Sequence, residues 1–404
     1  MKLRTIIAVI VLMAVLTPCR MYSADRTRLA PTPPMGFMTW NSYRQDISDS
    51  LIRRIADRMV EGGYLKAGYK YLCIDDCWQG GRDKHNNIIP DPEKFPHGMK
   101  ALVDYVHSRG LKVGIYSDAA QLTCAGLTAS YGFEKKDAKT FASWGIDYLK
   151  YDYCHAPSDS AVAHCRYQTM AEALSASGRD IVLGVCEWGQ LNPEMWASHA
   201  GGSLWRTTYD IVDTWVTNPP VKQGIYDILR LSEDKYSFAG RGRWLDMDQL
   251  IVGIRGRGLK TTDAFGAKGC SDVEYQTQMS LWCMMASPLL MSHDILNEDS
   301  ATRSILLNSE IIAIDQDTLC EAAYKVMEQD SVLYYMRHLA GNRIAVAALN
   351  AGETSKAISL PLLKFGISGS RTVRDVWRHS SRRTNRLKGT LKPHETMVVV
   401  VPAN

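Results

Sequence analysis

The chain has 404 residues, of which 46% are hydrophobic, and its formal net charge is +4. This length allows one large domain followed by a smaller one. Because the charge is small and no basic stripe is mixed with aromatic residues, nucleic acid is not expected as a partner. The basic cluster from Arg378 to Lys388 is interpreted as a solvated surface loop.

The N-terminus has the pattern of an export signal. Two basic residues precede an apolar stretch from Ile6 to Leu16, which is too short to span a bilayer comfortably. We therefore predict a signal peptide over residues 1–24 and an exported protein, periplasmic or secreted. Lipid attachment through Cys19 is a weaker alternative, since Pro18 fits a lipoprotein signal poorly.

Ten cysteines occur, one of them in the predicted leader. The remaining number is odd, so at least one cysteine of the exported protein stays unpaired. Cys73 and Cys77 have no Cys/His pair nearby, so a zinc site has little support. We expect mostly buried free thiols and no metal or other cofactor.

From about residue 34 to 315 the sequence alternates strand-like and helix-like segments. Such repetition predicts a parallel sheet with helices outside, and we expect a (β/α)8 TIM barrel over residues 25–318. The first strand should lie at 35–41 and the last near 287–292. Apolar stripes of helical period predict helices at 50–60, 99–106, 136–144 and 160–177.

Six of the strand-like runs end in a carboxylate. The carboxyl ends of barrel strands meet on one face, so these side chains should converge on one pocket. Such a pocket suits a neutral polyol and a transition state that develops positive charge; sugar hydrolysis meets both conditions and needs two carboxylates. The runs are 71–76, 111–118, 148–152, 181–187, 204–210 and 244–248, with Trp40, Trp188 and Trp205 near strand ends.

After about residue 320 the pattern changes to short β-rich runs separated by turn residues. It predicts a C-terminal antiparallel β-sandwich over residues 319–404. We expect this domain to be a structural cap on the barrel; a sugar-binding module is the alternative, although no exposed aromatic platform is evident. The runs are 332–337, 343–350, 357–362, 372–377 and 396–401.

The motifs resemble those of glycoside hydrolase family 27, the clan D α-galactosidases and α-N-acetylgalactosaminidases. The resemblance runs from Pro34 to about Val326, and more loosely to the C-terminus. Many specific motifs occur in the same order, which makes the resemblance strong. The matching segments are Met35-Gly36 with Trp40, 73–78, 95–98, 114–118, 123–126, 149–152, 186–189, Trp205-Arg206 with Asp210, 287–290 and 313–317.

The resemblance implies that Asp152 is the nucleophile and Asp210 the acid/base. Lys150 lies two residues before Asp152 and projects to the same side of the strand, where its ammonium would keep Asp152 ionised. Asp210 must be protonated when substrate arrives, so we expect burial and neighbouring carboxylates to raise its pKa. The simpler alternatives are a strand-end ion pair for Asp152 and a helix cap for Asp210.

The resemblance also implies the substrate contacts. Asp75 and Asp76 would accept hydrogen bonds from the 4- and 6-hydroxyls of galactose, and Trp40 would stack on its apolar face. The other implied contacts are Tyr116 and Lys150 at or behind the hydroxyls, Arg206 and Asp248 near the 2-hydroxyl and the nucleophile, and Cys186, Glu187 and Trp188 as the wall beside the 2-position. Cys124 and Cys154 match the family disulfide.

The segment around Asp248 departs from the family pattern. Asp246 and Asp248 are kept, but Leu245, Met247 and Gln249 replace the family's Asn, Pro and Met. The family's usual Cys after Trp40 is also missing, so Cys77 has lost its usual disulfide partner.

The activity that we expect is retaining exo-hydrolysis of terminal α-linked D-galactose from oligo- or polysaccharides by double displacement. An α-N-acetylgalactosaminidase would need small side chains where Glu187 and Trp188 are large. A non-catalytic galactose-binding protein would be expected to lose one catalytic carboxylate. A metal-dependent barrel hydrolase would need histidines at strand ends, and His85, His97, His107 and His155 are not grouped in that way.

Overall fold

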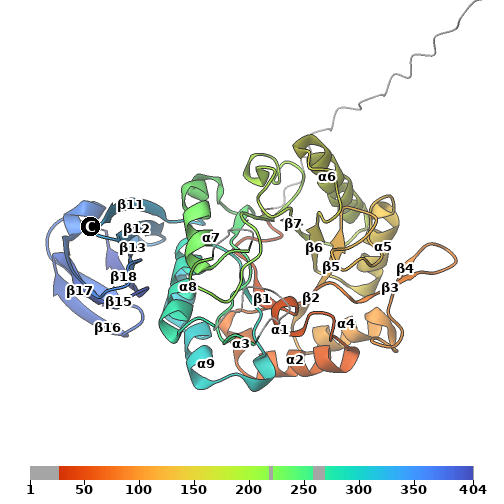
Figure 1. The fold of residues 1–404 in the computed structure, drawn as a ribbon, viewed down its shortest axis with the longest axis horizontal. Coiled ribbons are helices and arrows are strands. Elements are labelled where there is room, and N and C mark those ends of the chain that lie inside the picture. The colour runs from red at the N-terminus through yellow and green to blue at the C-terminus, as the bar shows by residue number, and fades with distance from the viewer. Residues whose placement is uncertain (1–26, 218–221, 258–268, 404) are drawn as a thin grey trace, which may run out of the picture.

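The computed structural model describes residues 27–217, 222–257 and 269–403. The predicted signal peptide and Cys19 therefore lie outside the described residues. A barrel and a smaller β-domain stand side by side (Figure 1). No helix in the described ranges is long and apolar enough to cross a membrane.

In the described part of the chain, eight parallel strands form one sheet in the order β10-β1-β2-β5-β6-β7-β8-β9. A parallel bridge between Leu250 and Met291 then joins the chain after β9 to β10. The predicted barrel is thereby confirmed. The strands are β1 Met35–Met38, β2 Tyr71–Ile74, β5 Lys112–Asp118, β6 Tyr148–Asp152, β7 Val182–Cys186, β8 Leu204–Arg206, β9 Trp244–Asp246 and β10 Leu289–Met291.

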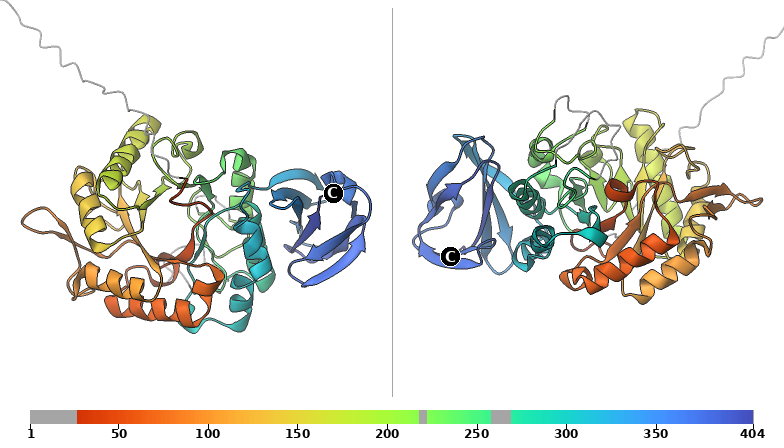
Figure 2. Two further views of the ribbon diagram at one scale, coloured as in Figure 1. Left: turned by 180° about the vertical axis from the view of Figure 1, so that it is seen from behind. Right: turned by 60° about the horizontal axis from the view of Figure 1, so that its bottom comes forward.

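Helices cover the outside of this sheet (Figures 1 and 2). The four predicted helices correspond to α2 Asp49–Glu61, α4 Gly98–Ser108, α5 Glu134–Trp144 and α6 Ser160–Ala176. The first strand is shorter than predicted, because the chain turns into α1 directly after Thr39. Further elements are the α-helices α1 Trp40–Tyr43, α3 Tyr64–Ala67, α7 Ile225–Ser232, α8 Asp272–Met284, α9 Ser300–Leu306 and α10 Ser309–Asp315, and the hairpin β3 Gln79–Arg82 with β4 Ile88–Pro90.

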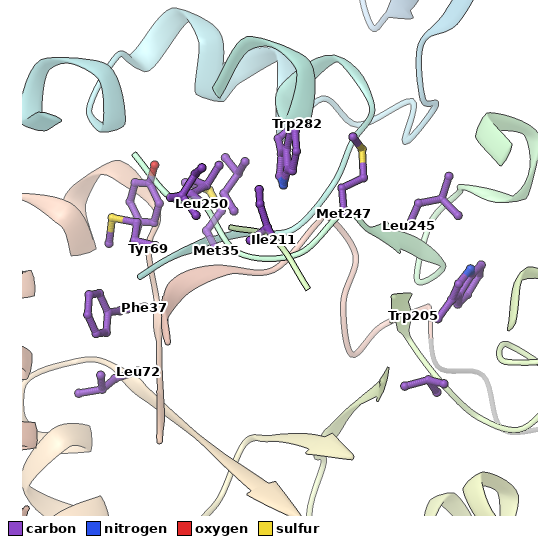
Figure 3. Packing of buried hydrophobic residues seen from close by; sticks show 14 of the residues in the cluster. Met35, Phe37, Tyr69, Leu72, Trp205, Ile211, Leu245, Met247, Leu250 and Trp282 are labelled. Carbon is purple, nitrogen blue, oxygen red and sulfur yellow. The ribbon is translucent and has the colours of Figure 1, made fainter. Parts of the chain in front are cut away.

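Alternate residues of the barrel strands have different surroundings, as the two-residue period of a strand requires. One set packs in a cluster that includes Tyr71, Tyr148 and Leu204. The other set packs in the large core with the helices, and this set includes Phe37, Trp205 and Leu245 (Figure 3). Trp205 is therefore a buried core residue and not part of a sugar pocket.

The C-terminal domain is an antiparallel sandwich, as predicted. A six-stranded sheet has the order β11-β12-β13-β18-β15-β16, and β14 pairs with β17. The strands are β11 Tyr324–Gln329, β12 Val332–Leu339, β13 Arg343–Asn350, β14 Lys356–Pro361, β15 Arg371–Asp375, β16 Ser380–Thr384, β17 Arg386–Leu391 and β18 Thr396–Pro402.

The predicted loop from Arg378 to Lys388 is wrong, since β16 and the start of β17 lie there. Most basic side chains of this segment face solvent, but Leu387 and Leu391 are buried in the sandwich. Because so many residues of this segment are charged, the alternation of buried and exposed residues typical of a strand was not evident in the sequence.

The larger sheet of the sandwich is buried on both faces. One face, with Val346 and Val399, packs inside the sandwich. The other face, with Ala347 and Val398, joins the core of the barrel beside α8 (Figure 1). Because this face of the sheet packs against α8, the sandwich and the barrel share one hydrophobic core.

Gly36 in β1 makes the close approach of β1 and β2 possible. A Cβ at this position would collide with the carbonyl oxygen of Tyr71 and lie 2.7 Å from its Cβ. We expect Gly36→Ala to destabilise the fold by about 1–3 kcal/mol, because the two strands must separate. The measurement is the unfolding midpoint in denaturant. Gly352→Ala is the matched control, since its nearest atoms would be 3.4 Å away; an equal effect of both variants would contradict this reading.

Candidate active site

A pocket of about 300 Å³ opens at the carboxyl ends of the barrel strands. Five aspartates and four basic residues contribute to its wall, so about half of its lining residues are charged. The described lining residues are Trp40, Asn41, Arg44, Asp75, Asp76, Tyr116, Cys124, Lys150, Asp152, Trp188, Arg206, Asp210, Ile211, Val212, Lys222, Asp248 and Gln249.

Asp152 is the last residue of β6 and is buried. One carboxylate oxygen accepts a hydrogen bond from the Tyr116 hydroxyl at 2.9 Å, and the other accepts one from the Tyr153 amide at 3.0 Å. Burial raises the pKa of Asp152 to about 6, although the Lys150 ammonium lowers it and the Asp210 charge raises it. Asp152 is thus mostly ionised near neutral pH and is held in a fixed orientation.

The turn after β2 fixes Asp75 and Asp76. The Lys150 ammonium lies 2.9 Å from Asp75, and the Asp76 amide donates to the same carboxylate at 2.8 Å. Asp76 accepts from the amides of Cys77 at 2.7 Å and Ala125 at 3.0 Å. Lys150 therefore contacts Asp75 directly and acts on Asp152 through its charge.

Arg206, at the end of β8, is 97% buried and binds two carboxylates. Its guanidinium lies 3.0 Å from Asp248 and 3.2 Å from Asp210. Asp248 has a positive φ of 69° and also accepts from the amides of Ile211 at 2.8 Å and Gln249 at 2.7 Å. The strand ends after β8 and β9 are thereby joined through one cation.

The expected rise in the pKa of Asp210 is wrong for this structure. Burial raises this pKa, but the Asp210 side chain is still 46% exposed. The charges of Arg206, Lys150 and Lys222 lower the pKa further than burial raises it. Asp210 is accordingly the more acidic member of the pair with Asp152.

Of the three residues expected beside the sugar's 2-position, the described pocket wall contains only Trp188. Cys186 lies beneath the pocket, where its sulfur is 3.8 Å from the Arg206 guanidinium. Glu187 is buried and accepts from the Leu191 amide at 2.6 Å, so it holds the loop that carries Trp188. Burial raises the pKa of Glu187 to about 7.

Cys124 and Cys154 form a disulfide between the loops after β5 and β6, with Cα atoms 5.2 Å apart. Asp118 lies behind it, accepts from the Cys154 amide at 3.0 Å, and has a pKa raised to about 9 by burial. Because the two sulfurs are bonded to each other, they do not provide thiolate ligands for a metal in this acidic corner. Among the described residues Cys77 is free and buried, in line with the loss of its usual partner.

Sequence reasoning missed several residues of the pocket. Asn41 lies in α1 and Arg44 directly follows that helix, so a short helix after β1 would have been the signal. Val212 and Lys222 enter because the chain after β8 folds back, with the Val212 amide donating to the Gln223 carbonyl at 2.9 Å. Nothing local in the sequence indicates that return.

The departures near Asp248 have distinct surroundings. Leu245 and Met247 are fully buried in the apolar core, whereas Gln249 lines the pocket. The Asp248 amide donates to Asp246 at 2.9 Å, which holds the turn.

The model of the family α-galactosidase A matches residues 32–317, and that of the α-galactosidase C-terminal β-sandwich domain matches residues 329–401. The chain is 38% identical to an α-galactosidase of Oryza sativa, over 93% of this chain and 86% of the relative. It is 41% identical to α-galactosidase A of Cellvibrio japonicus, over 81% of this chain and 78% of the relative.

Solved structures agree with these matches. α-Galactosidase I of Mortierella vinacea has a TM-score of 0.86 at 31% identity, covering 94% of this chain and 98% of its own. The Saccharomyces cerevisiae α-galactosidase with raffinose has a TM-score of 0.85 at 25% identity, covering 95% of this chain and all of its own (100%). The chain therefore belongs to the α-galactosidases of glycoside hydrolase family 27.

Proposed function

We propose that the chain removes terminal α-linked galactose by double displacement, with net retention of configuration. The observation that carries this proposal is one pocket holding Asp152 and Asp210, coupled in charge and supported by Lys150 and Arg206. Asp152 attacks the anomeric carbon while Asp210 protonates the leaving oxygen; Asp210 then activates water to hydrolyse the galactosyl ester.

Asp210 is ionised in the free site because neighbouring cations lower its pKa, so it must gain a proton before the glycosidic bond breaks. The two carboxylates titrate as a pair, so the position of their shared proton depends on their surroundings. A sugar over Asp210 would exclude the water that solvates its exposed side chain, which favours the protonated form. Asp152 stays ionised because Tyr116 and the Tyr153 amide donate to it.

The remaining pocket residues suit a galactose ring. Asp75 and Asp76 present carboxylate oxygens for its 4- and 6-hydroxyls, and Trp40 provides an apolar face. Tyr116, Lys150, Arg206 and Asp248 complete the polar wall, while Cys186 and Glu187 support that wall from behind. The structure of the yeast relative with raffinose supports oligosaccharides with terminal galactose as substrates.

We also propose that the protein is exported, with residues 1–24 as its signal peptide. The Cys124–Cys154 disulfide supports an oxidising compartment. The domain limits 25–318 and 319–404 remain our proposal; the family models, at 32–317 and 329–401, support a division near residue 320.

The two catalytic roles can be separated by leaving group. Asp152→Ala should abolish turnover of every substrate. Asp210→Ala should lower kcat/KM, which reports formation of the galactosyl ester, by about 10²–10⁴-fold on galactosides with poor leaving groups and much less on nitrophenyl galactoside, which needs little protonation. Azide should partly restore Asp210→Ala by attacking the galactosyl ester. Equal losses by both variants on both kinds of substrate would contradict the roles.

The Tyr116 hydroxyl should set the acidic limb of the pH profile. Tyr116→Phe removes a hydrogen bond that stabilises ionised Asp152, and hydrogen bonds to charged groups contribute about 1.5 kcal/mol or more. This corresponds to about one pKa unit, so the acidic limb of kcat/KM should move up by about one pH unit. Activity is then lost at low pH and kept at high pH. An unmoved limb would show that Tyr116 does not tune Asp152.

Trp188 should exclude an N-acetyl group at the sugar's 2-position. Overpacking a fixed site costs about 1–3 kcal/mol, and each 1.4 kcal/mol is about tenfold in rate. kcat/KM should therefore favour nitrophenyl α-galactoside over the N-acetylgalactosaminide by at least about tenfold. Trp188→Ala should narrow the ratio, whereas Trp144→Phe, on the outer helix α5, should not change it. A wild-type preference for the N-acetyl sugar would favour the rival activity.

A further inference from the structure

The segment that follows Asp210, residues 210–217, is here named the acid/base loop. It is tied back to the site at its start: the Ile211 amide donates to Asp248 at 2.8 Å, and the Gln223 amide donates to the Asp210 carbonyl at 3.0 Å. Such short links fix the backbone of Asp210 only if the rest of the loop is also held. Several contacts hold it: the Tyr226 amide donates to the Trp215 carbonyl at 2.9 Å, the Thr217 amide donates to Asp227 at 2.8 Å, and two side chains serve as anchors.

The first anchor is Asp213, whose side chain is buried. Its carboxylate accepts from the amides of Gly256 at 2.7 Å and Cys270 at 2.9 Å, and from the Tyr275 hydroxyl at 2.9 Å. This anchor fastens the loop to α8 and to the loop after β9. It lies entirely within the barrel.

The second anchor is Trp215, whose indole stacks with two other rings. Tyr226 of α7 stacks on it at 5.4 Å and 17°, and His394 stacks on it at 4.3 Å and 12°. His394 belongs to the turn between β17 and β18, so one of the two rings comes from the C-terminal sandwich. A residue 184 positions away from Asp210 thus contacts its loop through one side chain.

His394 is itself fixed from several sides. Its ring nitrogens lie 2.8 Å from Glu274 and 3.2 Å from Glu353, and its carbonyl accepts from the Thr277 hydroxyl at 2.6 Å. Glu274 and Thr277 belong to α8 of the barrel, whereas Glu353 belongs to the sandwich. The imidazole is therefore a rigid support that ties the sandwich, α8 and the acid/base loop together.

We propose that the sandwich positions the acid/base, with His394 acting as a positioning residue for Asp210 through Trp215. The inference rests on the proposed role of Asp210. Without His394 the loop would lose one of the two rings that stack with Trp215, and the Asp210 carboxyl would no longer be held against the leaving oxygen. Proton transfer from Asp210 to the leaving oxygen would become slower. Attack by Asp152, which lies on β6, on the anomeric carbon would be unaffected.

The test compares kcat/KM, which reports the step in which the leaving group departs, on a poor and a good leaving group, raffinose and nitrophenyl α-galactoside, in the full-length chain. His394→Ala should lower kcat/KM by about tenfold on raffinose, a part of the effect of a complete general acid, and by less than about twofold on the nitrophenyl substrate. The ratio of the two rates does not depend on the folded fraction. His394→Phe keeps a stacking ring and should restore most of the ratio.

Trp377→Phe is the matched control. The Trp377 indole donates to Ser280 at 2.8 Å, which is another contact between sandwich and barrel but does not involve the acid/base loop. It should leave the ratio unchanged even if it lowers stability. A change of the ratio in Trp377→Phe equal to that in His394→Ala would overturn the proposal, since it would show a general effect of a loosened interface.

A double-mutant cycle separates this proposal from the role of Asp210. In an Asp210→Ala background, His394→Ala should cause no further loss on raffinose, because the group that it positions is gone. If Asp210→Ala shows leaving-group dependence and His394→Ala shows none, the positioning role is wrong and the acid/base role stands. If Asp210→Ala itself shows no such dependence, the proposed function fails first, and the positioning role fails with it.

Discussion

Two cations, the buried Arg206 and the half-buried Lys150, make the acidic pocket possible. Five aspartates at the mouth of one barrel would repel one another and raise each other's pKa values if they stood alone. Lys150 contacts Asp75 at 2.9 Å, and Arg206 contacts both Asp248 and Asp210. Because Arg206 is almost fully buried, its interactions are poorly screened by solvent. Loss of either cation would leave an uncompensated buried carboxylate, so this arrangement constrains the whole strand-end surface.

The same cations help to give Asp152 and Asp210, two chemically identical side chains, different pKa values. Asp152 sits deep at the end of β6, and its pKa is raised to about 6. Asp210 stands closer to solvent, and neighbouring positive charge lowers its pKa. The difference between the two pKa values is set by the surroundings, and a bound substrate can change it by excluding water. One carboxylate can therefore be the nucleophile while the other takes up and releases a proton once in each cycle.

Much of this site could be predicted because the period of a strand is two. Lys150 and Asp152 had to share a face of β6, and the carboxyl ends of parallel strands had to meet. Residues placed by the return of loops could not be found in this way. Val212 and Lys222 reach the pocket only because the chain folds back after β8. Trp205 directly precedes Arg206, so the two-residue period of the strand turns its side chain to the opposite face, into the core. As a tryptophan near a strand end, it had been expected near the sugar pocket.

The roles of several residues depend on how deeply they are buried, which the local sequence does not show. Glu187 looks like a pocket residue, yet its carboxylate holds the backbone of its own loop, and Trp188 takes the place at the wall. The β-strands from Arg378 to Lys388 were hidden by charge, because only two leucines of β17 reach the sandwich core. The direction expected for the pKa of Asp210 failed because the sequence did not show how many cations surround it.

In this mechanism Asp152 becomes covalently bound to galactose during turnover. The most direct measurement uses a 5-fluorinated α-galactosyl fluoride, which forms the intermediate but slows its hydrolysis, followed by peptide mapping by mass spectrometry. We expect one sugar ester, on the peptide containing Asp152, that disappears slowly in water and is absent from Asp152→Ala. A label on another carboxylate, or inhibition of the enzyme without any covalent label, would contradict it.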